Sequence, residues 1–279
     1  MKVRYWLLAA LGSALLASQA LAQSGPVADA KPAADADPAN APICTDRPTK
    51  ANGPCTVPAG HWQVETDIVN WTYASQNGVR SDLVLSPNPT LKRGLTDHLD
   101  VEVNWAPYQM LRTRSAAGDT RASGIGDVYL RLKWALYSGA AVSVSVTPWV
   151  KAPTASRALG NGRVEEGVAA PININLPDKF ALTFGPELDA LENASLHGQH
   201  ASLVNLVGLS RPVTDKLTLF GEVWNDQNFD PTGTTSQSSA DVAAAYLLSN
   251  TLQFDLGANF GLNRATPRAQ AYVGVSKRF

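Results

Sequence analysis

From residue 61 to the C-terminus, apolar and polar residues alternate in short runs that are separated by turn-forming residues. In residues 251–263, for example, the even positions from Leu252 to Leu262 are apolar, whereas the odd positions from Gln253 to Asn263 are polar or glycine. Such alternation predicts β-strands with one apolar and one polar face. Residues 201–211 and 240–248 alternate too poorly for their faces to be assigned. We predict twelve strands, at residues 61–75, 82–93, 99–111, 125–137, 141–152, 163–176, 180–192, 201–211, 216–228, 240–248, 251–263 and 268–279.

The connections between these strands alternate in length. Tight turns follow the even-numbered strands, at residues 95–98, 138–139, 177–179, 214–215 and 249–250. Longer polar loops follow the odd-numbered strands, for example at residues 112–123, 153–162 and 229–239. Short turns at one rim and long loops at the other are typical of bacterial outer-membrane barrels. We therefore predict an all-β fold for residues 61–279: a transmembrane antiparallel up-and-down β-barrel of about twelve strands, with both termini on the short-turn, periplasmic side.

Alternation alone does not decide whether the apolar faces pack in a core or face lipid. A closed barrel of about twelve strands is too wide for side chains to fill, so its interior should be polar and wet. Aromatic residues also lie near the predicted strand ends, as in the interfacial girdles of membrane barrels. They are Trp62, Trp71, Tyr73, Trp105, Trp134, Tyr137, Phe180 and Tyr246. The alternative is a soluble sandwich whose core holds these aromatic residues; we favour the membrane barrel.

The N-terminal residues have the organisation of a secretory signal peptide. Lys2 and Arg4 precede an apolar run, and Ala20-Leu21-Ala22 offers a small-x-small cleavage pattern. We predict that residues 1–22 are removed, the alternative being a retained N-terminal anchor. Loss of these two positive charges lowers the formal net charge from −1 to −3. This mild balance argues against a nucleic-acid partner, which needs a basic surface.

Residues 23–60 are predicted to form a periplasmic leader. Residues 23–42 are rich in Ala, Pro and Asp and hold few large apolar side chains, as is typical of disorder. Two cysteines follow, Cys44 and Cys55. In an oxidising periplasm we expect them to form a disulfide. The competing reading, a metal site, is disfavoured because two thiols with no histidine between them make a poor ligand set.

The last nine residues, Ala271 to Phe279, resemble the C-terminal signature by which outer-membrane barrels are recognised for assembly. Gly274 and Phe279 occupy the expected places of this assembly signal, whereas Lys277 stands where an apolar residue is usual. The resemblance implies a Gram-negative outer-membrane protein whose partners are the barrel-assembly machinery and outer-membrane lipid. We expect a monomer.

Two further regions carry a family resemblance. Near the cysteines stand Thr45-Asp46-Arg47-Pro48 and Val57-Pro58-Ala59-Gly60, and the chain later contains Gly94-Leu95-Thr96-Asp97 and Gly124-Ile125-Gly126-Asp127. These motifs are similar to those of a family of outer-membrane transporters named for the meta-cleavage (MetA) pathway of phenol degradation. The resemblance implies a barrel for the uptake or efflux of small, aromatic or hydrophobic compounds. It implies no binding residue.

The polar faces of the predicted strands carry many charges, which we expect to line the lumen. The candidate permeant contacts are Asp127, Arg131, Lys133, Lys151, Glu187, Asp189, Glu222, Asp226 and Asp255, and Glu65, Asp67, Asp100 and Glu102 should also face inward. These charges would select permeants by field and size. The other reading is that opposed charges only brace the barrel wall. Arg131 and Lys133, neighbours on one face, should meet carboxylates of adjacent strands.

We therefore predict a porin-like channel or transporter for small solutes, without a cofactor, a metal or enzymatic activity. Two alternatives stay open: a lipid-modifying hydrolase, and a non-conducting structural or adhesive barrel. A hydrolase needs a nucleophile, a base and an orienting group within hydrogen-bond reach. His197 and His200, with Ser195 and Ser202 near them, do not form a recognisable motif of this kind, and they are also a weak metal-ligand pair.

Overall fold

The computed structural model describes residues 40–195 and 197–279. The predicted signal peptide, residues 1–22, lies outside the described residues, as do residues 23–39 of the predicted leader. Helix η2 (Pro177–Lys179) occupies one of the turns. In the described part of the chain, no helix has both the length and the apolar character needed to cross a membrane.

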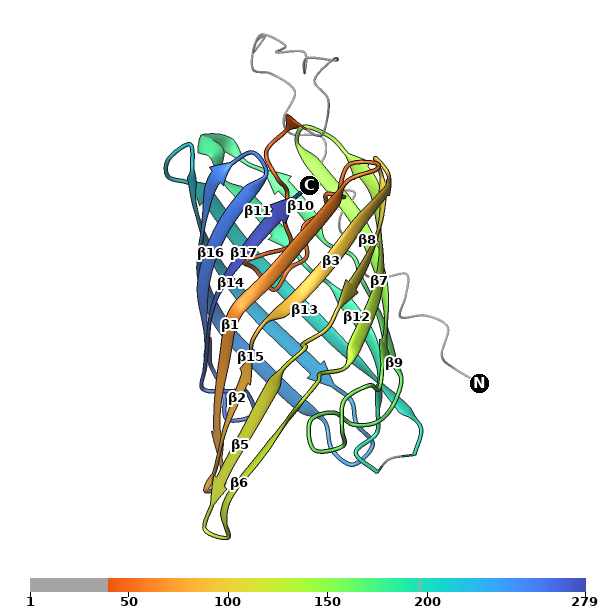
Figure 1. The fold of residues 1–279 in the computed structure, drawn as a ribbon, viewed down its shortest axis with the longest axis vertical. Coiled ribbons are helices and arrows are strands. Elements are labelled where there is room, and N and C mark those ends of the chain that lie inside the picture. The colour runs from red at the N-terminus through yellow and green to blue at the C-terminus, as the bar shows by residue number, and fades with distance from the viewer. Residues whose placement is uncertain (1–39, 196) are drawn as a thin grey trace, which may run out of the picture. The chain divides into compact units, whose positions relative to one another are not determined.

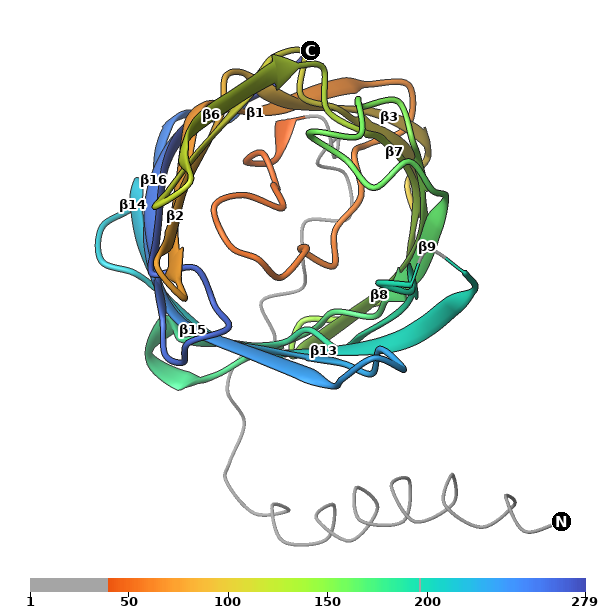
Figure 2. The ribbon, with the colours of Figure 1, turned by 90° about the horizontal axis from the view of Figure 1, so that it is seen from below.

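One antiparallel sheet contains all the strand segments of the described residues. These are β1 (Trp62–Gln76), β2 (Val79–Leu85), β3 (Asn88–Thr96), β4 (Leu99–Asn104), β5 (Gln109–Ser115), β6 (Gly118–Gly124), β7 (Val128–Ser138), β8 (Val142–Ala152), β9 (Glu165–Ala169), β10 (Ile172–Asn175), β11 (Ala181–Phe184), β12 (Glu187–Glu192), β13 (Gln199–Pro212), β14 (Leu217–Asn228), β15 (Thr235–Ser249), β16 (Leu252–Gly261) and β17 (Ala269–Arg278). The first segment, β1, pairs with the last, β17, so the sheet closes on itself. Figures 1 and 2 show the resulting barrel from the side and along its axis.

Five of the barrel strands are interrupted once near their middle. They consist of the consecutive segments β2 and β3, β4 and β5, β6 and β7, β9 and β10, and β11 and β12. The described sheet is therefore a closed barrel of twelve antiparallel strands, which confirms the predicted fold. Proline lacks the N–H that a sheet needs, and four of the five interruptions contain one: Pro87, Pro107, Pro171 or Pro186.

The predicted tight turns all lie at one end of the barrel, which we call the short-turn rim. Residues 153–164, 193–198, 229–234 and 262–268 connect strands at the opposite, long-loop rim. One predicted loop is wrong, because residues 112–123 belong mostly to the β5–β6 hairpin, whose turn is only residues 116–117. This hairpin extends beyond the neighbouring strands (Figure 1). In the part that extends beyond the neighbouring strands, neither face of the hairpin has to be apolar. Its sequence is therefore as polar as that of a loop, which explains the wrong prediction.

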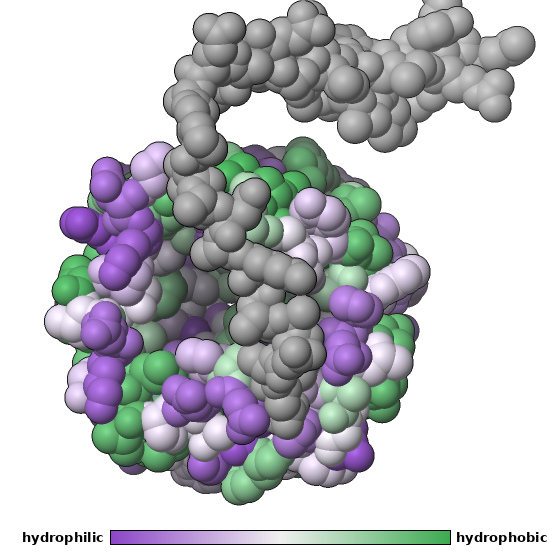
Figure 3. Space-filling model, turned by 90° about the horizontal axis from the view of Figure 1, so that it is seen from above, coloured by the Kyte–Doolittle hydropathy of each residue, from purple (hydrophilic) through white to green (hydrophobic). Residues whose placement is uncertain are grey.

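Apolar side chains cover the outer wall and polar side chains face the interior, as the alternation predicts. In β16, Leu256 and Phe260 are 59% and 51% exposed on the outside, whereas Asp255 is 3% exposed. In β7, Trp134 faces outward and Lys133 is fully buried on the inside. Figure 3 shows hydrophilic and hydrophobic residues mixed around the hollowed centre at the short-turn rim. An outer wall of this kind is suited to lipid.

Candidate functional site

Residues 42–57 lie inside the barrel, and we call them the lumen segment (Figure 2). The backbone N–H of Ile43 donates to the carbonyl oxygen of Asn250 at 2.7 Å. At the other end of the segment, the N–H of Val57 donates to Oδ2 of Asp100 at 2.8 Å. A disulfide between Cys44 and Cys55 closes the segment into a loop, with a Cα–Cα distance of 6.4 Å. Part of the predicted periplasmic leader therefore occupies the lumen.

Arg47 binds a row of three residues that lie side by side on the inner wall. Asp67 of β1 pairs with Gly274 of β17, which in turn pairs with Asp255 of β16. The guanidinium group lies over Gly274 and bridges the two flanking carboxylates, with Nη1–Asp67 Oδ1 at 2.5 Å and Nη2–Asp255 Oδ1 at 2.6 Å. A Cβ atom at Gly274 would lie 2.2 Å from Nη2. Glycine at this position therefore makes room for the arginine.

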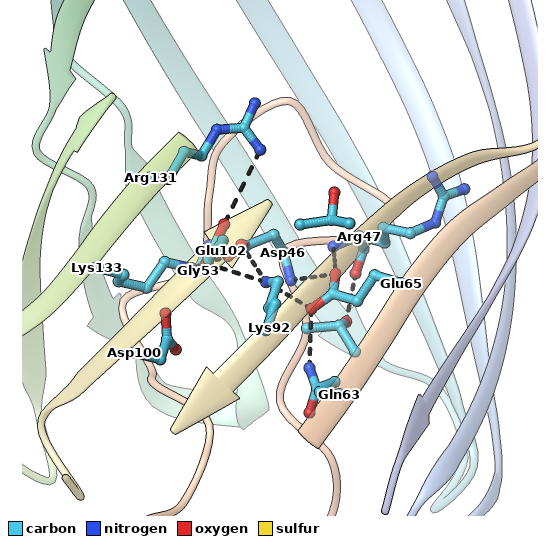
Figure 4. A network of polar contacts seen from close by, with 12 residues as sticks. Asp46, Arg47, Gly53, Gln63, Glu65, Lys92, Asp100, Glu102, Arg131 and Lys133 are labelled. Carbon is cyan, nitrogen blue, oxygen red and sulfur yellow. Dashed lines mark hydrogen bonds and ion pairs between the residues drawn. The ribbon is translucent and has the colours of Figure 1, made fainter. Parts of the chain in front are cut away.

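Asp46, the neighbour of Arg47, enters a second cluster on the wall formed by β1, β3, β4 and β7 (Figure 4). Its carboxylate forms ion pairs with Lys92 and Lys133 and accepts a hydrogen bond from the N–H of Gly53 at 2.7 Å. Burial raises the pKa of Asp46, but the two ammonium groups outweigh burial and hold this pKa well below its ordinary value. Asp46 is therefore ionised wherever the lumen segment is seated.

The wall side of this cluster is a row of alternating charge. Lys92, Glu102 and Arg131 face one another across β3, β4 and β7, an arrangement that stabilises neighbouring strands. Nζ of Lys92 lies 2.6 Å from Glu65 Oε1 and 3.4 Å from Glu102 Oε1. Lys133 Nζ is also 3.4 Å from Glu102 Oε1, whereas Arg131 Nη1 is 3.9 Å from Oε2. Arg131 and Lys133 therefore both meet the carboxylate of Glu102 on the adjacent strand β4, in line with the sequence-based expectation.

Lys50 attaches the middle of the lumen segment to another part of the wall. Its Nζ lies 3.0 Å from Asp241 Oδ2 and 4.4 Å from the centre of the Trp224 ring. It also donates to the hydroxyl of Ser239 at 2.6 Å. The backbone N–H of Lys50 donates to Oε1 of Glu222 at 3.2 Å. The segment thus carries three charged side chains, Asp46, Arg47 and Lys50, each of which binds partners on the barrel wall.

Three carboxylates on β12 and β14 have no such cation. Among the described residues, no ion pair joins Glu187, Asp189 or Asp226 to a basic side chain; Glu187 accepts from Trp149 Nε1 at 2.7 Å instead. Asp189 is 8% exposed, and its Oδ1 has no hydrogen-bond partner. This oxygen lies against Gly167, where a Cβ would be 2.1 Å away. This part of the inner wall therefore holds three acidic side chains without a basic partner among the described residues.

Asp127 and Lys151 hold the loop of residues 153–164 over the lumen. Lys151 Nζ lies 2.6 Å from Glu165 Oε2 and 3.5 Å from Asp127 Oδ2. Asp127 Oδ1 accepts a hydrogen bond from the N–H of Ala155 at 2.9 Å. These contacts position the loop, so they have a clear structural purpose whether or not a permeant meets them.

A cavity of about 360 Å³ remains between the lumen segment and the wall. Thr49 and Asn52 line it from the segment, and Thr183, Phe220 and Gln253 line it from the wall. Its lining combines hydroxyl and amide groups with apolar surface, as binding sites for small amphipathic molecules do. Its volume lies at the lower end of the range for ligand pockets, about 300–1,000 Å³.

The structure brings the sequence-predicted candidates to the inner wall in separate groups. Asp255 binds the lumen segment through Arg47, Lys133 through Asp46, and Glu222 through the backbone of Lys50. Asp226 accepts a hydrogen bond from the Ser202 hydroxyl. Their roles as permeant contacts stay predictions. The sequence reading missed the partners Asp46, Arg47, Lys50, Lys92 and Asp241.

Among the described residues, no hydrogen bond joins His197 or His200 to a hydroxyl or thiol group. His197 Nδ1 lies 2.9 Å from the carbonyl oxygen of Ser195, and His200 Nδ1 lies 2.9 Å from Oδ1 of Asn193. His200 Nδ1 is also 3.5 Å from Asp230. Within residues 40–195 and 197–279, no group of three or more His, Cys, Asp or Glu side chains is arranged to hold a metal ion.

A comparison with protein families identifies the group to which this barrel belongs. Residues 45–279 match the family described as "Putative MetA-pathway of phenol degradation". The chain is a member of this phenol-degradation family. The match confirms the resemblance found in the sequence. It includes most of the lumen segment as well as the whole barrel, so Asp46, Arg47 and Lys50 all lie within the family domain.

Solved structures place this member of the phenol-degradation family among outer-membrane barrels. An outer membrane channel from Pseudomonas putida F1 is 18% identical, with a TM-score of 0.61 over 83% of this chain and 100% of that chain. The NanC porin is 8% identical, with a TM-score of 0.51 over 77% of this chain and 98% of that chain. The transport unit of the autotransporter AIDA-I from Escherichia coli is 10% identical, with a TM-score of 0.50 over 84% and 92%.

At sequence identities of 8–18%, the similarity to these solved structures shows that the fold is shared. No curated protein sequence has significant similarity to the chain. Together with the apolar outer wall and the polar inner wall, the shared fold makes this protein an outer-membrane β-barrel.

Proposed function

We propose that this protein is a channel for small solutes, and that the lumen segment narrows its passage. The cavity of about 360 Å³ beside the lumen segment carries this proposal. A cavity of about 150 Å³ is sufficient to hold benzene, so this one has room for a single aromatic ring with polar substituents. Phe220 offers apolar contact, and Thr183 and Gln253 offer hydrogen bonds. Membership of the phenol-degradation family supports a permeant of this chemistry.

We further propose that both termini and the short-turn rim face the periplasm and that the protein is a monomer. The two ends of the barrel meet at this rim, where the N–H of Phe279 donates to the carbonyl oxygen of Trp62 at 2.8 Å. An even number of strands returns the chain to the side on which it entered. The C-terminal strand with Gly274 and Phe279 would serve as the signal for the assembly machinery. Labels at Ala116 and Thr234 should react in intact cells; protection at both would reverse the orientation.

The charges of the inner wall act on permeants rather than on a chemical bond. Candidates that form an ion pair with an oppositely charged side chain, among them Asp255, Lys133 and Lys151, hold the segment or a loop in place. Glu187, Asp189 and Asp226 have none and would attract cations into the passage. Three solved barrels that share this fold are a channel, a porin and a transport unit. They support transport over an enzymatic function.

Conductance and solute flux test the channel. Purified protein in planar bilayers should conduct ions, and liposomes that contain it should take up phenol faster than protein-free liposomes after subtraction of passive leak. A larger sugar such as a trisaccharide should enter more slowly, because the lumen segment occupies part of the cross-section. Folded protein that shows neither conductance nor phenol uptake above leak would refute the proposal.

A further inference from the structure

A three-stranded extension of β2, β5 and β6 reaches past the rest of the long-loop rim (Figure 1). The strand register places six charged side chains on one of its faces. Arg80 lies opposite Arg114 and Asp82 opposite Arg112, while Arg112 lies opposite Arg121 and Arg114 opposite Asp119. Residues that lie opposite each other, or two apart on one strand, share a face. We call Arg80, Arg112, Arg114 and Arg121 the arginine patch.

The arginine patch is on the outside of the barrel. Asp82 lies opposite Tyr73 and Val84 opposite Trp71 on the neighbouring strand β1. Trp71 is 37% exposed on the outer wall, while its neighbour Asn70 is buried on the inside. The rings of Trp71 and Tyr73 stack at 6.1 Å, and Trp71 Nε1 donates to Asp82 at 3.0 Å. Aromatic side chains of this kind mark the level of lipid headgroups.

The patch holds more positive charge than its own carboxylates can neutralise. Arg112 binds Asp119, with Nη2–Oδ2 at 2.5 Å, and Arg114 binds Asp82. Within the described residues, no ion pair engages Arg80 or Arg121, and both are exposed. Four arginines against two carboxylates leave an excess of two positive charges.

The register also sets like charges against each other. Arginine lies directly opposite arginine in the pairs Arg80–Arg114 and Arg112–Arg121, an arrangement that destabilises a strand pair. Exposed ion pairs such as those of Arg112 and Arg114 contribute only about 0–1 kcal/mol, so stability does not account for the cluster. An anion that bridges the guanidinium groups would relieve the repulsion.

We propose that the arginine patch binds the phosphates of a phosphorylated glycolipid, lipopolysaccharide, in the outer leaflet. Guanidinium groups pair with phosphate through two parallel hydrogen bonds. The outward face next to Trp71 and Tyr73 lies where a lipid presents its headgroup, and Val84 and Met110, on the same face, offer apolar contact below it. The choice of the outer leaflet rests on the orientation proposed above.

The test measures binding of bisphosphorylated lipid A to the full, folded protein in a non-ionic detergent by native mass spectrometry. Arg80→Gln with Arg121→Gln removes the two arginines that have no ion pair and leaves the Arg112 and Arg114 pairs intact. We expect this variant to bind lipid A at least tenfold more weakly than the wild type. The matched control is Arg211→Gln, since Arg211 lies 4.9 Å from the Phe180 ring near the opposite rim; its affinity should be unchanged. Heat-modifiable gel mobility verifies that each variant is folded.

Three outcomes would overturn the proposal. The first is equal affinity of wild type and double variant, and the second is equal affinity for lipid A without phosphates. The third is displacement of lipid A by inorganic phosphate at an equal phosphate concentration, which would indicate a simple anion site. The measurement needs no conductance, so a protein that binds lipid A but does not conduct would refute the channel alone.

Discussion

Replacing Arg47 by glutamine should release the lumen segment from the barrel wall. We call the state in which the lumen segment lies against the wall seated, and the state in which it has left the wall released. In the seated state the substitution leaves Asp67 and Asp255 without their cation, and the side chains of these two residues are 4% and 0% exposed. Breaking a buried ion pair by removing one partner costs about 3–5 kcal/mol, because the remaining charge is buried and uncompensated. Release of the segment admits water to both carboxylates and avoids this cost. The seated state should therefore lose about 3 kcal/mol relative to the released state.

A change of about 3 kcal/mol shifts a two-state equilibrium roughly a hundredfold. In single-channel recordings of Arg47→Gln, the ratio of time at the wide, released level to time at the narrowed, seated level should rise by about this factor. The released level should conduct more than the seated level, since the segment no longer occupies the lumen. Arg264→Gln, which removes an exposed arginine from a long-loop connection, is the control and should leave both quantities unchanged.

A charge-matched rescue distinguishes release from a general loss of stability. Adding Asp67→Asn and Asp255→Asn to Arg47→Gln removes the buried charges, so the seated state should recover much of its population. The reasoning would be refuted if Arg47→Gln folded normally yet gated like the wild type. It would equally be refuted if the triple variant stayed as open as the single one.

Three further predictions concern the same lumen. Replacing Cys44 and Cys55 by serine removes a cross-link between residues 11 apart, so the released segment gains up to about 3 kcal/mol of chain entropy. The time spent at the released level should therefore rise in single-channel recordings. Wild-type protein treated with reductant should match the variant. Glu187→Gln with Asp189→Asn should reduce cation preference, seen as a reversal potential closer to zero in a KCl gradient; an unchanged potential would show that these carboxylates do not face the ion path. The contribution of Asp46 to the seating of the segment should survive mild acidification. The pKa of Asp46 is lowered, so its contribution is complete above the ordinary value of about 3.8 and is lost only as pH falls towards the lower, folded-state value. If the difference in gating between the wild type and Asp46→Asn disappeared with a midpoint between pH 5 and 6, the assignment of Asp46 as one of the anchors of the segment would be contradicted.

The barrel can be predicted from the sequence because one face of each strand contacts lipid and the other faces the polar interior, so apolar and polar residues alternate. The alternation is too poor to assign the faces of two strands, β13 and β15, and the structure shows the reason. Leu206 of β13 faces inward and is 4% exposed, and Ala51 of the lumen segment lies beside it across Gly185. Ala245 of β15 lines the cavity next to the segment. Apolar side chains occur on these inner faces because the lumen segment covers them.

The site was predictable only in part. Asp255 and Lys133 could be placed in the lumen from their strands, but their partners Arg47 and Asp46 belong to a segment without regular structure. No periodicity describes such a segment, and its contacts reach across the chain: Arg47 and Asp255 are 208 residues apart. Lys92 could have been predicted as a lumen residue, since it lies on a predicted strand and the alternation of that strand places its side chain on the inner face.

The row Asp67–Gly274–Asp255 also has a consequence for the order of folding. It exists only after β1 has paired with β17, the last pairing to become available in a chain synthesised from its N-terminus. Arg47 is 20 residues from one of its carboxylates and 208 from the other, and contacts of such long sequence separation form late. The arginine can therefore bind both partners only once the cylinder has closed. Seating of the segment would thus report completed assembly, and a nascent, still open sheet would keep its N-terminal residues free.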